Sequence, residues 1–295
     1  MPLVTHETEA SVAFVGAGPG DPELLTLKAQ RLISRADRII YADSLVNPAV
    51  CQHAKAGAQI YGSSTLTLEA MMEIMLSAVA QKQFVVRLQS GDPAIYGAMH
   101  EQRRLLDQAG VAYMIVPGVS SIFAAAAVAG VELTVPDVAQ SLILTRREGR
   151  VEMPEKETLR AFASHGTTLG IFMSITRVRQ VVEDLLAGGY AEDTPALVVY
   201  RATWPEQQII RATLATLVPA VKSARISRQA LIVVGRALET TSEDVDSADG
   251  ETVHRSHLYS PTYKHLFRGG VSDAKIAPPE PASPATTSEQ MPHVD

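Results

Sequence analysis

The segment GAGPGDP at residues 16–22 follows the apolar run VAFVG and precedes a leucine-bearing helical pattern. This setting is typical of a dinucleotide-binding loop, in which the pattern G-x-G-x-x-G lets backbone N–H groups reach a pyrophosphate. Gly16 and Gly18 fit the pattern, but Asp21 replaces the third glycine and would repel a phosphate at the helix N-terminus. Pro19 also lacks a backbone N–H. The loop therefore favours a ligand without phosphates, and a dinucleotide site stays an alternative.

A second segment, QSGDPAIYG at residues 89–97, repeats the Gly-Asp-Pro tripeptide between another predicted strand and a helical pattern. VPGVSS at residues 116–121 follows a further strand. In an open α/β sheet, the carboxyl ends of the strands form the edge where ligands bind. The glycines could serve only tight turns, or they could let a large flat ligand approach the backbone. The repeated tripeptide favours the second interpretation.

Short β-branched runs alternate with helical patterns along most of the chain, which is typical of an α/β protein. Strands are predicted at residues 12–16, 38–42, 84–88, 112–116, 141–145, 168–173, 196–203, 208–213 and 230–235. Pro205 separates two adjacent runs of the second half, so these two strands should form a hairpin. We expect two α/β lobes that meet near residue 117, the first with a mostly parallel sheet and the second with a mixed sheet.

Two helices of the first lobe are predicted from apolar residues at helical spacing. The first should have Asp21 as its N-cap and Pro22 in its first turn. The apolar face of this helix comprises Leu25, Ala29, Leu32 and Ala36. The second helix has a stripe that we interpret as core rather than as a cofactor site, formed by Met72, Met75, Leu76 and Val79.

The chain has 295 residues and a net charge of −6, with both signs spread along it. It has no basic stripe of the kind that nucleic-acid backbones require, so DNA and RNA are not expected partners. The single cysteine, Cys51, excludes an internal disulfide and a multi-cysteine metal cluster. No signal-peptide pattern is present, and no apolar run approaches the roughly 20 residues of a membrane helix. We expect a cytoplasmic protein without a membrane partner.

The composition changes at residue 239. Residues 239–251 are acidic and polar, which predicts a solvated linker, and the Pro/Ala/Ser-rich residues 277–295 are predicted to be disordered. The segment 257–271 contains aromatic and basic residues and is either a docking segment or an unanchored tail. Three histidines near it lack a rigid scaffold, so we expect no metal site there: His254, His257 and His265.

Four motifs occur in order along the chain: VGAGPGDPELLT, SGDPAIYG, VPGVSS and ILTRREG. Together they resemble the tetrapyrrole (corrin/porphyrin) methylases, over about residues 12–238. Members of this family transfer a methyl group from S-adenosylmethionine (SAM), many of them to a corrin precursor. Within the family, YADSLVNP, TRREGR and YRATWPEQ are most similar to the precorrin-4 C11-methyltransferase group. The resemblance implies methylation of precorrin-4 at C11, giving precorrin-5, in cobalamin biosynthesis.

The resemblance also implies a domain organisation and a cofactor site. An N-terminal tail (1–11) would precede an N-terminal α/β domain (12–117), a C-terminal α/β domain (118–238) and the acidic linker and mostly disordered tail (239–295). SAM would lie in the cleft between the two domains of a homodimer subunit. The SAM contacts carried over from the family are Pro19, Gly91, Asp92, Ile95, Tyr96, Ser120, Ser121, Phe172, Met173, Ala202, Thr203, Ala230 and Leu231.

For the tetrapyrrole, the resemblance places the first glycine loop, with Gly16 and Gly18, at the edge of a trough, where Tyr41 could pack on a ring. The carboxylates of a tetrapyrrole need basic partners, for which the candidates are Arg146, Arg147, Arg150 and Arg201. From the sequence alone, the arginine run could equally be a solvated loop. The candidate proton acceptors are Asp21, Asp43 and Glu148, although Asp21 could serve only as a helix cap and Asp43 only as a turn residue.

Other functions stay open. Uroporphyrinogen-III methyltransferases of the family have an arginine directly after the second loop, where this chain has Ala98, which disfavours that substrate without excluding it. Another precorrin methyltransferase, a tetrapyrrole carrier without catalysis, and a dinucleotide oxidoreductase with Asp43 on the ribose are the further alternatives. The methyl-accepting carbon is an enamine-type nucleophile, so catalysis should require no metal. The sequence does not indicate whether the substrate contains cobalt.

Overall fold

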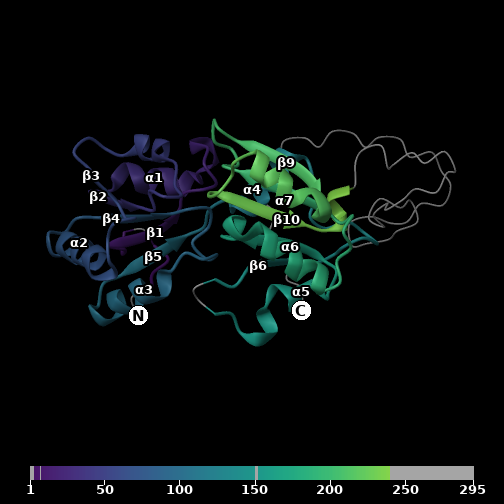
Figure 1. Ribbon diagram of the computed structural model, residues 1–295. Helices are drawn as coiled ribbons and strands as arrows, with labels where there is room; N and C mark the ends of the chain where they lie inside the picture. The colour runs from purple at the N-terminus through teal and green to yellow at the C-terminus, as the bar shows by residue number, and fades with distance from the viewer. Residues whose placement is uncertain (1–2, 7, 150–151, 240–295) are drawn as a thin grey trace, which may run out of the picture. The chain divides into compact units, whose positions relative to one another are not determined.

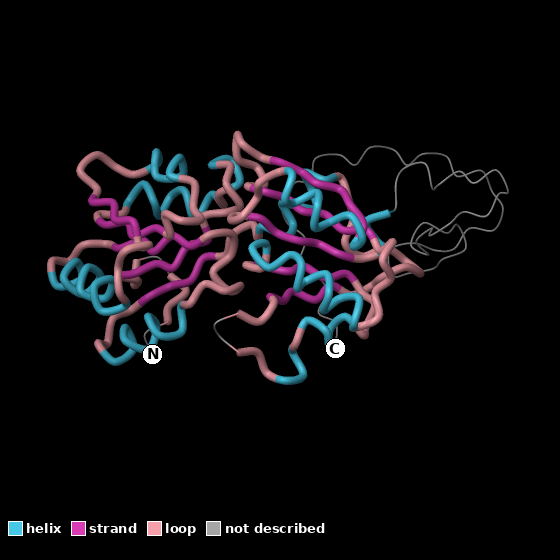
Figure 2. Tube along the Cα trace, in the orientation of Figure 1, coloured by secondary structure: helices cyan, strands magenta, loops and turns pink. Residues whose placement is uncertain are grey.

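The computed structural model describes residues 3–6, 8–149 and 152–239. These residues form two five-stranded sheets with helices on their faces, so the predicted fold of two α/β domains is confirmed (Figures 1 and 2). We call the sheet β1–β5 with helices α1–α3 the first lobe, and the sheet β6–β10 with helices α4–α7 the second lobe. Arg150, the three tail histidines and the candidate docking segment 257–271 lie outside the described residues.

The first lobe has an all-parallel sheet in the order β3-β2-β4-β1-β5. Its strands are β1 Val12–Gly16, β2 Arg38–Tyr41, β3 Gln59–Gly62, β4 Val85–Gln89 and β5 Tyr113–Val116. Four of them match predicted strands to within one residue at either end. The edge strand β3 was missed because it is short and partly exposed, so it lacks a buried apolar run. All the loops that follow these parallel strands emerge at one edge of the sheet.

Helices cover both faces of the first sheet. Helix α1 (Leu27–Arg35) packs on the face that presents Val15 and Leu88. Helices α2 (Leu68–Ala80) and α3 (Met99–Gln108) pack on the opposite face. Met72 and Met75 of α2 are buried there, so the methionine stripe belongs to the core as predicted.

The first helical region departs from the prediction in its boundaries. Asp21 is an N-cap, but the helix it caps is a short 3-10 helix, Pro22–Leu24, in which the Asp21 side chain accepts a hydrogen bond from the Glu23 N–H. Helix α1 begins later, with Thr26 as its own N-cap. The apolar spacing alone joined the two helices, because the extended backbone at Leu25 and Thr26 leaves no signal in that spacing.

The second lobe has a mixed sheet in the order β6-β7-β10-β8-β9. Its strands are β6 Leu142–Arg146, β7 Thr168–Phe172, β8 Pro195–Tyr200, β9 Gln208–Thr213 and β10 Ala230–Val234. The predicted hairpin is confirmed, since β8 and β9 pair antiparallel. Strand β8 ends three residues earlier than predicted because Arg201 and Thr203 have positive φ angles of 47° and 69°, which no strand accommodates.

Helix α4 (Ser121–Ala129) packs on one face of the second sheet and helices α5 (Leu159–Ala163), α6 (Val178–Ala187) and α7 (Leu214–Ser223) on the other. The further 3-10 helices are Pro48–His53, Glu155–Glu157, Ile175–Arg177 and Arg236–Glu239. Within the described residues no helix has the length and apolar character needed to span a bilayer. Strand β5 ends at Val116 and α4 begins at Ser121; the domain boundary at residue 117 stays a prediction.

Candidate functional site

The two Gly-Asp-Pro loops contact each other directly at the carboxyl edge of the first sheet. The Gly18 N–H donates to the Gly91 carbonyl at 3.2 Å, and the Gly91 N–H donates to the Gly18 carbonyl at 2.8 Å. A Cβ on Gly16 would lie 2.6 Å from Gly118 Cα and from the Gly91 carbonyl oxygen. Only glycine permits this approach, so Gly16 and Gly18 hold three loops together.

Asp92 connects the second of these loops to the third. One carboxylate oxygen accepts a hydrogen bond from the Ala94 N–H at 2.8 Å, and the other accepts from the Gly118 N–H at 2.9 Å. The loop continues through Tyr96 and Ala98, which have positive φ angles of 54° and 47°. The hydrogen bonds of Asp92 thus tie the second loop to the third, and residues of both loops line the cavity described below.

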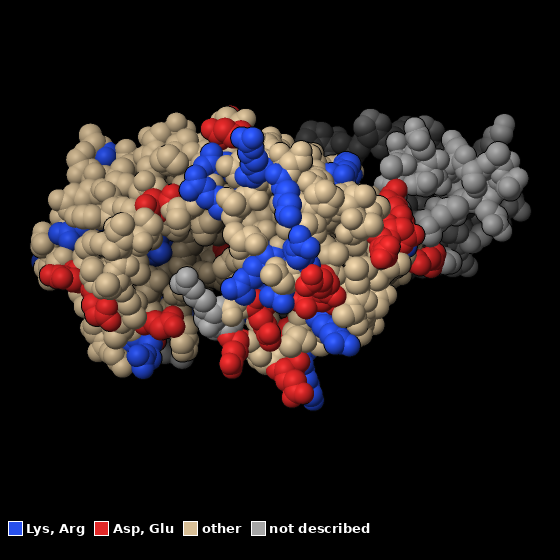
Figure 3. Space-filling model, in the orientation of Figure 1, with Lys and Arg blue, Asp and Glu red and all other residues tan. Residues whose placement is uncertain are grey.

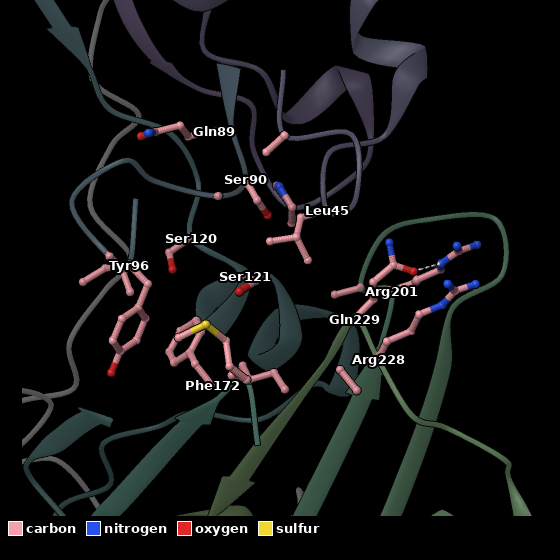
Figure 4. A pocket seen from close by; sticks show the side chains of 18 of the residues that line it. Leu45, Gln89, Ser90, Tyr96, Ser120, Ser121, Phe172, Arg201, Arg228 and Gln229 are labelled. Atoms are coloured by element: carbon pink, nitrogen blue, oxygen red, sulfur yellow. Dashed lines mark hydrogen bonds between the residues drawn. The ribbon is translucent and has the colours of Figure 1, made fainter. Parts of the chain in front are cut away.

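A cavity of about 500 Å³ opens beside these loops and is lined by residues of both lobes. Figure 4 shows Leu45, Gln89 and Ser90 on its first-lobe side and Phe172, Arg201 and Gln229 on its second-lobe side. The predicted SAM residues that line it are Pro19, Gly91, Asp92, Ile95, Tyr96, Ser120, Ser121, Phe172, Met173, Ala202, Ala230 and Leu231. Of the predicted set, only Thr203 is absent from the lining.

The second-lobe wall of the cavity has an apolar part, next to the polar residues Arg201, Arg228 and Gln229. Phe172 ends strand β7, and its ring lies 5.5 Å from the ring of Tyr96 in the first lobe, measured between centroids. Met173 follows with a positive φ of 50° and a side chain that is 63 % exposed. Ala230 and Leu231 begin strand β10. Such a wall can receive a flat, uncharged ring and a thioether, since neither needs a charged partner.

Trp204, in the connection between β8 and β9, joins the second lobe to the first glycine loop. Its indole Nε1 donates a hydrogen bond to the Pro19 carbonyl at 2.9 Å. Gly20 is required under the indole, because a Cβ there would lie 2.0 Å from the ring. Thr203 contributes beside it, since its hydroxyl accepts from the Asp21 N–H at 3.0 Å. Thr203 therefore stabilises the loop that forms the cavity wall, although it does not itself line the cavity.

The predicted tetrapyrrole arginines occupy different surroundings. Arg201 lines the cavity and donates to the Gln229 side chain at 2.7 Å (Figure 4). Its guanidinium carbon lies 4.8 Å from the centroid of the Trp204 ring. Arg147 does not line the cavity and pairs with Asp184 at 2.5 Å. Arg146 does not line the cavity either, although it acts on Tyr96. Burial raises the pKa of Tyr96, and the positive charge of Arg146 partly opposes this rise.

The three predicted proton acceptors do not line the cavity. Asp43 accepts hydrogen bonds from the backbone N–H and the hydroxyl of Ser64, at 2.7 and 2.6 Å, and these bonds hold its pKa below the ordinary value. Asp21 acts as the helix cap. Glu148 has an exposed side chain, and its backbone carbonyl accepts from Arg177 at 2.7 Å. The geometry thus accounts for Asp21 and Asp43 as structural groups.

The remaining predicted substrate residues, Gly16, Gly18 and Tyr41, also lie outside the lining. Tyr41 ends strand β2 and is half-buried against the core, and this burial raises the pKa of its phenol.

Sequence reasoning missed several lining residues: Ala42, Leu45, Arg87, Gln89, Ser90, Trp204, Arg228 and Gln229. Arg87 and Gln89 carried a detectable signal, since polar side chains in the otherwise apolar run FVVRLQ are unusual for a buried strand. Arg228 and Gln229 carried none, because a polar pair before a strand is ordinary. Among the described residues, no group of three or more His, Cys, Asp and Glu side chains could hold a metal ion.

Two α/β lobes with a cavity lined by loops at strand ends are the arrangement typical of proteins that bind small molecules. The family model described as Tetrapyrrole (Corrin/Porphyrin) Methylases matches residues 11–218. The chain belongs to this family.

Curated relatives share the sequence over most of its length. A cobalt-precorrin-4 C(11)-methyltransferase of Methanocaldococcus jannaschii is 45 % identical over 89 % of this chain and 97 % of its own. A precorrin-4 C(11)-methyltransferase of Pseudomonas aeruginosa is 43 % identical over 88 % of this chain and 99 % of its own.

Solved structures share the fold. A cobalt precorrin-4 methyltransferase matches with a TM-score of 0.77 and 44 % identity, covering 80 % of this chain and 99 % of its own. A uroporphyrin-III C-methyl transferase of Thermus thermophilus, complexed with S-adenosylhomocysteine (SAH), matches with a TM-score of 0.66 and 32 % identity, covering 78 % of this chain and 99 % of its own. The chain thus resembles members of the family along nearly their full length.

Proposed function

We propose that this chain is a SAM-dependent methyltransferase that methylates precorrin-4 at C11, giving precorrin-5. The observation that carries the proposal is the cavity of about 500 Å³, lined from both lobes by twelve of the thirteen residues that the family resemblance assigns to SAM. Relatives of this printed activity are 40–45 % identical to the chain over 85 % of it or more, which supports the same acceptor.

The lining residues fit SAM in their chemistry. Phe172, Met173, Ala230 and Leu231 offer an apolar surface for the adenine and the thioether. The loop at Gly91 offers backbone groups for the amino-acid end. SAM lacks phosphates, which agrees with a loop in which Asp21 occupies the helix N-terminus. SAM would supply a methyl group on a positively charged sulfur, which makes that group electrophilic.

The contribution of the chain would be to hold two ligands in line rather than to move protons. Reacting atoms must approach to about 3–3.5 Å, and correct orientation supplies much of the rate. Asp43 holds a lowered pKa and lies outside the lining, so it is a weak base for this reaction. The half-enclosed cavity excludes part of the solvent from the two ligands.

A basic surface agrees with a polycarboxylate substrate. On the face drawn in Figure 3, Lys and Arg side chains gather over the second lobe near its border with the first, with acidic side chains among them. Arg201 and Arg228 belong to the cavity lining. Arg146 does not line the cavity, but its positive charge acts on Tyr96, which does.

The finer parts of the proposal are predictions: a homodimer, a cytoplasmic location, catalysis without a bound metal, and no nucleic-acid or membrane partner. Relatives are named both for precorrin-4 and for cobalt-precorrin-4. The cobalt content of the substrate is therefore an outcome of the test below.

The test is a substrate panel. The purified chain is incubated with SAM in three parallel reactions, which contain precorrin-4, cobalt-precorrin-4 or uroporphyrinogen III. The masses of the products are measured by mass spectrometry. We expect a gain of one methyl group on one of the two precorrin-4 forms and none, or a slower gain, on uroporphyrinogen III. If only uroporphyrinogen III gains methyl groups, the proposed acceptor is wrong. If none of the three tetrapyrroles gains a methyl group but one of them still binds, the alternative of a tetrapyrrole carrier without catalysis holds.

A further inference from the structure

Arg87 is a buried cation on the wall of the cavity. It lies in the middle of strand β4, pairs in register with Phe14 of β1 and Ile40 of β2, and is only 6 % exposed. Both neighbours are apolar and fully buried. Arg87 nevertheless belongs to the cavity lining, so it reaches the ligand space from the first-lobe side.

The hydrogen bonds of Arg87 leave much of its guanidinium unpaired. Nη1 donates to the backbone carbonyls of Leu88 and Ile40, at 3.0 and 3.3 Å. In the part of the chain that the structure describes, Nε and Nη2 have no hydrogen-bond acceptor. No described carboxylate forms an ion pair with Arg87 either.

Asp43 is the acidic group that influences Arg87, and it does not neutralise it. Both Asp43 oxygens are engaged by Ser64. Burial lowers the pKa of Arg87 to about 10, and the negative charge of Asp43 partly opposes this shift. Arg87 is therefore positively charged at neutral pH. A buried cation that lacks an anionic partner costs several kcal/mol, and an apolar side chain of similar size would avoid this cost.

Arg38 shows what a buried arginine with a structural role looks like in the same sheet. It lies on β2, is 9 % exposed, and does not line the cavity. One of its nitrogens donates to the Ile74 carbonyl at 3.0 Å and to the Ser77 hydroxyl at 2.7 Å, which fixes helix α2 against the strand. The Arg38 Nε is likewise buried without a hydrogen-bond partner, so Arg87 is distinguished by its place in the cavity lining and by having no link to a helix among the described residues.

We propose that Arg87 binds a carboxylate of the ligand in this cavity through its guanidinium group, which the described residues leave only partly paired. A guanidinium is suited to this role because it stays charged and can form two parallel hydrogen bonds with a carboxylate. The inference rests on the proposed function, which supplies two sources of carboxylate: the side chains of the tetrapyrrole and the amino-acid end of SAM. Arg87 lines the cavity together with Ala42 and Leu45, which belong to the YADSLVNP segment that resembles the precorrin-4 group, and this favours the tetrapyrrole over the amino-acid end of SAM.

The test measures binding by calorimetry with three probes: cobyrinic acid, a corrin with free carboxylates; dicyanocobinamide, a corrin with amidated side chains; and SAH. The variants are Arg87→Met, which keeps the bulk without the charge, and Arg87→Lys, which keeps the charge. Arg38→Met is the matched control. We expect Arg87→Met to lower the affinity for cobyrinic acid about 10- to 100-fold, because the substitution removes a charge-assisted pair of hydrogen bonds. Dicyanocobinamide and SAH should keep their affinities.

Arg87→Lys should weaken the binding of cobyrinic acid less than Arg87→Met does. If the methionine variant does not fold, the comparison of Arg87→Lys with the wild type carries the test: cobyrinic acid should bind more weakly to the lysine variant, while dicyanocobinamide and SAH keep their affinities. Arg38→Met should leave all three affinities unchanged. A loss of SAH affinity instead of cobyrinic acid affinity would assign the carboxylate to SAM and keep the role of Arg87. Unchanged affinities for all probes in folded Arg87 variants would overturn the proposal. The proposal would also be overturned if the wild type bound cobyrinic acid and dicyanocobinamide with equal affinity while the substitutions left the SAH affinity unchanged. Failure of the proposed function is a separate result, namely no methyl gain by the wild type.

Discussion

At the scale of residues, the first glycine loop shows how one residue type serves packing rather than ligand contact. Gly16 lets three loops meet, Gly20 lets Trp204 close over the backbone, and only Pro19 of this segment reaches the cavity. The sequence predicts that the loop does not suit a phosphate, because Asp21 occupies the helix N-terminus and Pro19 lacks a backbone N–H. It did not show which glycines touch ligand, because close contacts between loops depend on partners about 75 to 185 residues away.

Replacing Gly16 by alanine should destabilise the protein. The new Cβ would lie 2.6 Å from Gly118 Cα and the Gly91 carbonyl oxygen, so backbone must move. We expect a loss of about 1–3 kcal/mol in the free energy of unfolding, measured by urea denaturation. Gly149→Ala is the control, since its Cβ would meet only the end of the Arg177 side chain at 3.4 Å. Equal stability of the two variants would mean that the three loops are not packed as described.

Asp43 gives a pH-dependent prediction. Its pKa is lowered in the folded state, mainly by the hydrogen bond with the Ser64 side chain, so it contributes stability above its unfolded pKa of about 3.9. This contribution is lost as the pH falls through the lower, folded pKa. Asp43→Asn should therefore reduce the melting temperature at pH 7, and the difference from wild type should shrink near pH 3.

Ser64→Ala should show the same pH trend, because it removes the hydroxyl that stabilises the carboxylate. The pH–rate profile between pH 6 and 8 should keep its shape in Asp43→Asn, since the carboxylate is already ionised throughout that range. A profile that changes shape there would identify Asp43 as a group that titrates during catalysis.

At the scale of elements, strands with continuous apolar runs were predicted well, and the errors concern the short, partly exposed strand β3 and the boundaries of α1 and β8. The turn at Arg201 ended β8 early because Trp204 packs on Gly20, which the local sequence cannot reveal. Parallel strands place their following loops at one edge, so the convergence of the two Gly-Asp-Pro loops could be predicted. The pairing of Arg147 with Asp184 could not, because it depends on how α6 packs beside β6.

Trp204, in the connection between β8 and β9, should report ligand binding through its fluorescence. Trp204 is the single tryptophan of the chain and lines the cavity, while its indole donates to the Pro19 carbonyl. Binding of SAH should therefore shift or quench the intrinsic tryptophan fluorescence in a saturable way, with the same midpoint as calorimetry. NAD⁺ at equal concentration is the control and should leave the emission unchanged. Saturable SAH binding by calorimetry with constant emission would contradict the position of Trp204.

At the scale of the whole described structure, the cavity exists because two lobes of different sheet type are held together through specific loop contacts. Three hydrogen bonds join the lobes: Trp204 donates to the Pro19 carbonyl, the Asp21 N–H donates to the Thr203 hydroxyl, and Gln229 donates to the Ser44 carbonyl. The first lobe presents loops and the buried Arg87, and the second presents an apolar surface together with Arg201 and Arg228. This division suits a reaction in which a polycarboxylate acceptor and an uncharged adenosine group must be held facing each other.

The central claim is methyl transfer to C11 of a precorrin-4, and one measurement tests it most directly. The chain is incubated with SAM that carries a ¹³C-labelled methyl group and with the form of precorrin-4 that it uses. Long-range ¹H–¹³C correlations in the NMR spectrum of the product then assign the ring carbon that bears the label. We predict a single new labelled methyl group, bonded to C11. A label on any other ring carbon, or a product without label, would contradict the account.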